Sequence, residues 1–84
     1  MKSFNLNNYV YVKLTDKGRD IYYHQYDHIQ GIKPSYPKED NNGYFKEQLW
    51  QLMKTFGKHM SMGFDQPFST DIIFEEAYLK EVKL

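Results

Sequence analysis

The segment YFKEQLWQLMKTFGKHMSMG, Tyr44 to Gly63, carries the strongest helical period in the chain and constrains its fold most. Its large apolar side chains recur at intervals of three and four residues, which places them on one face of an α-helix. We expect a core helix over about residues 44–56, with a buried stripe of Phe45, Leu49, Leu52, Met53 and Phe56. Gly57 favours a helix end there, and continuation to Gly63 is the alternative.

The stretch NNYVYVKLT, residues 7–15, alternates aliphatic residues with tyrosine and lysine. A period of two in β-favouring residues predicts a half-buried strand over about residues 9–14, with Val10, Val12 and Leu14 facing inward. Thr15 is a suitable N-cap, so we expect a helix over about residues 16–29. Gly18 in its first turn predicts the close approach of another segment.

Two prolines in IKPSYPKEDNNG exclude a helix and predict an extended connection at about residues 31–43, which we expect Ile32 and Tyr36 to hold against the domain. Apolar and polar side chains alternate over residues 68–75, which predicts a second strand, whereas residues 76–84 are compatible with helix, strand or tail.

The expected fold of residues 1–84 is therefore one α+β domain. In it, a small antiparallel sheet of strands at about 9–14 and 68–75 is packed by the helices at about 16–29 and 44–56.

The amino-acid composition argues against several classes of function. Eleven basic and eleven acidic residues give a net charge of +0, which disfavours nucleic-acid and anionic-membrane partners. With no cysteine, disulfides, thiolate metal sites and thiol catalysis are excluded. Neither a signal-peptide pattern nor an apolar run near the roughly 20 residues of a membrane span is found, so we expect a cytoplasmic protein without membrane contact.

His24 and His28, four residues apart in RDIYYHQYDHIQ, would lie on adjacent turns of the predicted helix, a spacing that can chelate Zn²⁺ or Ni²⁺. A metal site needs at least a third protein ligand, and the only other histidine is His59, whose position the sequence leaves open. The alternative, which we favour, is a pair of solvated histidines on the flank of a helix. We expect no cofactor.

The segment LTDKGR, Leu14 to Arg19, resembles the strand-to-helix junction of winged-helix regulators. The resemblance implies a nucleic-acid-binding regulator, with Lys13, Lys17 and Arg19 as its local cluster of cations. The neutral net charge argues against it, and no helix-turn-helix precedes the segment. We keep this function as the alternative.

No Ser/His/Asp arrangement, glycine-rich phosphate loop or isolated carboxylate pair stands out, so we do not expect an enzyme.

Aromatic residues outside the predicted core favour protein binding instead, because exposed Trp and Tyr are typical interface anchors. We expect the partner-binding residues to be Trp50, Tyr23, Tyr9 and Tyr11. The alternative for Trp50 is packing at the edge of the core or beneath the proline-containing connection.

Three segments of the chain, NNYVYVKLTDKG, GYFKEQLWQLMKTFGKHMSMG and PFSTDIIFE, together resemble small uncharacterised proteins encoded by tailed phages and prophages of gut-type bacteria. The resemblance spans most of the chain and transfers no site residue. It implies an accessory protein in the host cytoplasm that acts by binding. We therefore expect a non-catalytic protein-interaction module, with modulation of a host or phage protein as one role, and a second copy of the chain as an alternative partner.

Overall fold

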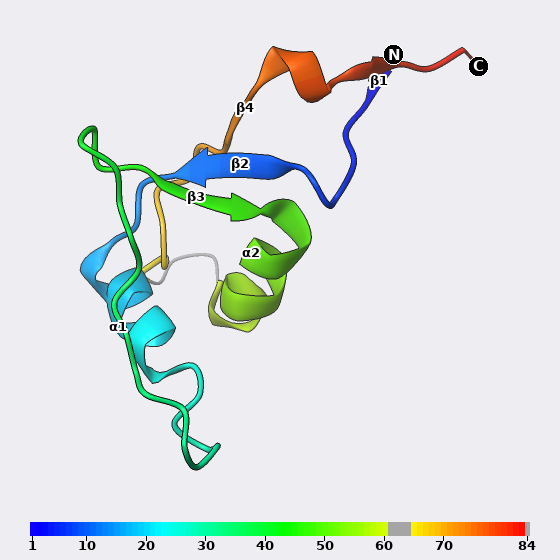
Figure 1. The fold of residues 1–84 in the computed structure, drawn as a ribbon. Coiled ribbons are helices and arrows are strands. Elements are labelled where there is room, and N and C mark those ends of the chain that lie inside the picture. The colour runs from blue at the N-terminus through cyan, green and yellow to red at the C-terminus, as the bar shows by residue number, and fades with distance from the viewer. Residues whose placement is uncertain (61–64, 84) are drawn as a thin grey trace.

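A computed structural model describes residues 1–60 and 65–83 (Figure 1). It contains two α-helices and two small antiparallel sheets, which confirms the predicted α+β class. The elements are β1 (Lys2–Ser3), β2 (Tyr9–Val12), α1 (Asp16–His24), β3 (Phe45–Gln48), α2 (Leu49–Phe56), the 3-10 turn η1 (Gly57–His59), β4 (Ile73–Phe74), the 3-10 turn η2 (Glu76–Tyr78) and β5 (Lys80–Glu81).

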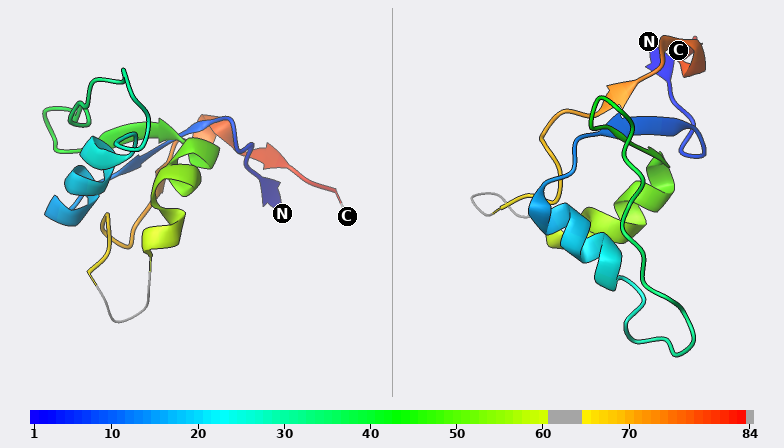
Figure 2. Two further views of the ribbon diagram at one scale, coloured as in Figure 1. Left: turned by 90° about the horizontal axis from the view of Figure 1, so that it is seen from below. Right: turned by 60° about the vertical axis from the view of Figure 1, so that its left-hand side comes forward.

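The central sheet has the strand order β3-β2-β4, and all its pairs are antiparallel. Val10 lies opposite Phe74, and an isolated bridge between Leu14 and Phe68 continues the pairing of these two parts of the chain. The predicted strands therefore do pair, although β4 is regular over only two residues. Both helices lie on the same side of this sheet (Figure 2).

The predicted helix over residues 44–56 is wrong in its first part. Phe45–Gln48 form strand β3, and α2 begins only at Leu49. The apolar period does not reveal this change, because Phe45 reaches the core from the strand and Leu52 and Phe56 reach it from the helix. Met53, expected in the core, is 58% exposed.

Gly57 does cap α2, but in a right-handed conformation with φ −55°, and the chain continues through η1. A left-handed glycine is therefore not what ends α2. The alternative end at Gly63 lies outside the described residues.

Helix α1 starts as predicted, because Thr15 is its N-cap and its Oγ1 accepts a hydrogen bond from the Gly18 N–H at 3.2 Å. The helix ends at His24, five residues before the expected end at 29. Tyr26 and Ile29, which the predicted helix would have included, are 43% and 42% exposed. Residues beyond His24 thus have no core to pack against, and a short helix depends on such packing.

Among residues 1–60 and 65–83, one cluster of seven buried apolar residues forms the core: Val10, Val12, Leu14, Phe45, Leu52, Phe56 and Phe68. The inward orientation predicted for the three residues on and after β2 is confirmed. So is the close approach at Gly18, where an added Cβ would lie 1.8 Å from the Pro67 carbonyl oxygen.

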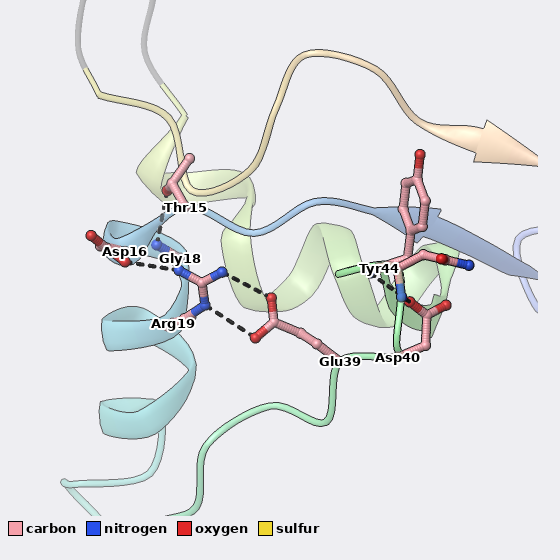
Figure 3. Close-up of polar contacts among 8 residues, drawn as sticks. Thr15, Asp16, Gly18, Arg19, Glu39, Asp40 and Tyr44 are labelled. Carbon is pink, nitrogen blue, oxygen red and sulfur yellow. Dashed lines mark hydrogen bonds and ion pairs between the residues drawn. The ribbon is translucent and has the colours of Figure 1, made fainter.

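Tyr36 helps to hold the proline-containing connection as expected, because its ring stacks on Tyr23 of α1 with 4.5 Å between ring centres, although Tyr36 is 67% exposed. Ile32, the other expected anchor, is 45% exposed and does not reach the core. Pro37 is buried instead, and Glu39 accepts two hydrogen bonds, at 3.1 and 3.0 Å, from the Arg19 guanidinium of α1 (Figure 3). A fork-shaped ion pair of this kind fixes orientation as well as distance. The connection then turns at Asp40, whose Oδ1 accepts the backbone N–H of Tyr44 at 2.9 Å.

The two ends of the described chain lie side by side (Figure 1). Strand β1 pairs with β5 in a second, two-stranded sheet. The segment after Glu75, for which the sequence allowed helix, strand or tail, contains the turn η2 and then β5. Phe4 connects this sheet to the central one by packing 4.8 Å from the Phe74 ring.

Candidate interaction surface

The face of the central sheet that points away from the helices carries tyrosines and lysines. Tyr9 and Tyr11 project there from β2, and Lys46 of β3 places its Nζ 5.0 Å and 5.7 Å from the centres of their rings. Ile73 of β4 is 42% exposed and lies opposite Tyr11 in the register. Cation–π contacts of this type hold the rings at the surface in a defined arrangement.

The same face continues to the strand ends, where Lys13 lies over the Tyr44 ring at 5.0 Å. Tyr11 Oη donates a 2.6 Å hydrogen bond to Glu75. This bond raises the pKa of Tyr11, because ionisation would remove the donated proton and place a phenolate beside a carboxylate. We call this surface the tyrosine face; it consists of Tyr9, Tyr11, Lys13, Tyr44, Lys46 and Ile73.

Trp50 lies in the first turn of α2 and is 40% exposed. Its backbone N–H donates to the Leu6 carbonyl at 3.1 Å, which ties the start of the helix to the turn before β2. Leu6 and Met53 are also exposed, by 54% and 58%. These three residues form the Trp50 cluster, and because Tyr9 pairs with Gln48, the cluster begins at the end of the sheet where Tyr9 lies.

Sequence reasoning missed two members of the Trp50 cluster. Met53 was assigned to the core because it fits the helical period, and only the position of α2 against the sheet turns it outward. Leu6 stands alone among asparagines in NLNN, where no periodicity marks it. The one feature that could have marked Leu6 as exposed is its isolation, because a large apolar residue in a polar turn has no apolar neighbour in the sequence to pack against.

Tyr23 is not part of either surface. Its ring stacks on Tyr36 of the proline-containing connection, with 4.5 Å between ring centres, and contacts His24 edge-on at 5.0 Å. The four predicted binding residues therefore occupy three places. Tyr9 and Tyr11 lie together, Trp50 lies at the adjoining end of the sheet, and Tyr23 lies on α1. No aromatic ring in the described part of the chain pairs with the Trp50 indole.

His24 and His28 are not on adjacent helical turns, because α1 ends at His24. His24 Nδ1 lies 2.6 Å from Asp27, and Nε2 lies 3.5 Å from Asp20, so both of its ring nitrogens face carboxylates of the same segment. Within residues 1–60 and 65–83 no group of three or more histidine or acidic side chains is placed to hold a metal ion.

The cations proposed for nucleic-acid binding are occupied by contacts within the chain. Lys17 Nζ donates to the Asp65 carbonyl at 2.7 Å, and Arg19 is shared between Asp16 and Glu39. Lys13 lies over the Tyr44 ring. The segment from Leu14 to Arg19 thus serves to begin α1 and to hold the connection. Of the three cations, Lys13 is the one whose ammonium group contacts a ring and not an oxygen atom, so the three do not form a group of unpaired cations.

No family model, curated protein sequence or solved structure matches this chain. Among the described residues, no helix has the length and apolar character that crossing a membrane requires.

Proposed function

We propose that this protein is a non-catalytic interaction module that binds another protein. The observation that carries the proposal is the exposure of the Trp50 cluster, three large apolar side chains that α2 and the turn before β2 hold outward. Tryptophan is the residue type most enriched among interface anchors, and anchors on rigid elements lose little entropy on binding.

The tyrosine face extends this surface around the end of the sheet. Its rings supply a broad amphipathic area, and Lys46 adds a charge that a partner's carboxylate would complement. The resemblance to proteins of tailed phages and prophages supports an accessory role in the bacterial cytoplasm, where the module would modulate a host or phage protein. A second copy of the chain is the alternative partner, because Lys46 of the tyrosine face and Glu75, which accepts the Tyr11 hydrogen bond beside it, carry opposite charges that two copies could pair.

The test is affinity capture from a nuclease-treated bacterial lysate at low and high salt, with wild type and Trp50→Ala compared. We expect a protein that survives high salt and whose recovery with Trp50→Ala falls by about tenfold, the effect of losing one anchor. Ile32→Ala is the matched control, since Ile32 is 45% exposed but lies on the connection. If both variants recover the partner equally well, then Trp50 does not anchor the interface. If circular dichroism shows that Trp50→Ala is unfolded, then Trp50 belongs to the core and is not a binding residue.

A nucleic-acid-binding regulator is the second candidate, and the tyrosine face is the observation that favours it. Tyrosine rings on a sheet can stack bases while lysines beside them contact phosphates. If Lys13 and Lys46 each neutralise one phosphate, the logarithm of the affinity for single strands should fall with the logarithm of salt concentration with a slope of about −1.4. Binding that does not depend on salt excludes this candidate.

A further inference from the structure

A groove of about 600 Å³ runs between α1 and α2, on the side of the central sheet opposite the tyrosine face. The protein-interaction proposal does not use it. The acidic and basic side chains along its walls are Asp20, His24, His28, Lys54, Lys58 and His59, so all three histidines of the chain reach one groove. Its volume is that of a small-molecule site.

The unpaired charge in this groove is positive. Lys54 in the last turn of α2 and Lys58 in η1 are one helical turn apart, and neither has an ion-pair partner among the described residues. Asp20, the one carboxylate in the lining, lies 3.5 Å from His24. The carbonyl end of α2 contributes only about half a negative charge, which two ammonium groups outweigh. The α2 wall therefore complements an anion.

The opposite wall is suited to a flat apolar group. Tyr26 and Ile29 line the groove and remain 43% and 42% exposed, although both are large and apolar. Gln25 and Gln51 supply amide donors and acceptors in the same lining. A ring that rests on Tyr26 could be hydrogen-bonded at its edge by these amides.

We propose that the groove binds a small phosphorylated ligand with a planar ring, of the nucleotide type. Its phosphate contacts Lys54 and Lys58, and its ring packs on Tyr26. A phosphate monoester fits this wall better than a carboxylate does, because its charge of about −2 balances two ammonium groups and it has three acceptor oxygens. A metal ion is not the ligand, because no suitable cluster of three side chains is present in the described residues.

The test is a titration of the full chain with adenosine monophosphate, adenosine and inorganic phosphate, followed by calorimetry and by amide chemical shifts of Gln51 and Thr55. We expect saturable binding of the nucleotide, at least about tenfold tighter than either fragment. Lys54→Gln with Lys58→Gln should weaken it by about tenfold or more. Lys38→Gln with Lys83→Gln, which removes the same charge outside the groove, should leave it unchanged.

Three results would overturn this inference. One is the absence of saturable nucleotide binding at millimolar concentration. Another is adenosine binding as tightly as the nucleotide, since the lysines would then have no role. The third is an equal loss in the two double variants, which would mean non-specific attraction. Tyr26→Ala separates the two halves of the site: it should lower the preference for the nucleotide over inorganic phosphate, and an unchanged preference also contradicts the proposal.

Discussion

At the scale of single residues, Gly18 sets how closely the segment around Pro67 approaches α1. A Cβ at this position would lie 1.8 Å from the Pro67 carbonyl oxygen and 3.3 Å from Leu14 Cδ2. The oxygen cannot move away without loss, because it accepts the Thr15 N–H at 3.0 Å. One missing side chain thus permits the return of the chain towards β4.

Gly18→Ala should therefore destabilise the protein by about 1–3 kcal/mol, the usual cost of overpacking, despite the better helix propensity of alanine. Gly57→Ala is the matched control, because Gly57 has φ −55° and an added Cβ would meet no atom of another segment within 4 Å. That variant should be neutral or up to about 1 kcal/mol more stable. Urea unfolding of both measures the difference, and equal midpoints would show that Pro67 moves without cost.

At the scale of elements, α1 depends on the hydroxyl of Thr15. The Oγ1 atom accepts the Gly18 N–H at 3.2 Å and donates to the Gln66 carbonyl at 2.6 Å. The same atom therefore caps the helix and ties it to the segment before β4. A helix of nine residues is too short to be stable without such support.

Thr15→Ala should cost about 1–2 kcal/mol and lower the helical signal in far-ultraviolet circular dichroism, since both hydrogen bonds are lost together. Thr15→Ser keeps the hydroxyl and should retain most of the stability. Urea unfolding provides the measurement. A serine variant as unstable as the alanine variant would mean that the threonine methyl group, and not the capping bond, stabilises this junction.

Elements defined by local signals were predictable, and those defined by distant partners were not. Thr15 and the alternation around Val10 and Val12 act within a few residues, so the sequence reveals β2 and the start of α1. Strand β3 exists because residues 45–48 pair with β2, more than thirty positions away, and this pairing overrides an apolar period that fits a helix. The partner of Tyr23, the Tyr36 ring, is likewise invisible to local patterns.

The residues of the candidate interaction surface divide in the same way, into features that local periodicity predicts and features that depend on distant parts of the chain. That Tyr9 and Tyr11 share the outer face of the sheet follows from strand periodicity alone, and the position of Trp50 away from the buried stripe follows from the helical period. That Lys46 lies over both tyrosines requires the register between β2 and β3. The convergence of three histidines on one groove requires the packing of α1 on α2.

At the scale of the whole molecule, the protein is extended for its length. Its radius of gyration is 14.5 Å, whereas a compact chain of this size has about 12 Å, and its longest dimension is 47 Å. The two-stranded sheet of the chain ends projects beyond the central sheet, and the turns after α1 project beyond the end of that helix on the opposite side of the molecule (Figure 2). The seven core residues lie in the central part, so stability is concentrated there.

Removing the chain after Tyr78 should consequently cost only about 1 kcal/mol or less. Strand β5 pairs over two residues with β1, all four are exposed, and the Lys2–Glu81 ion pair at 3.7 Å lies in solvent. Leu52→Ala, at a position 2% exposed, should cost about 2–5 kcal/mol. Urea unfolding compares the two, and small-angle scattering should show a smaller radius of gyration for the truncated chain. If truncation is as damaging as Leu52→Ala, then the contact of Phe4 with Phe74 depends on β5 and the terminal sheet belongs to the cooperative core.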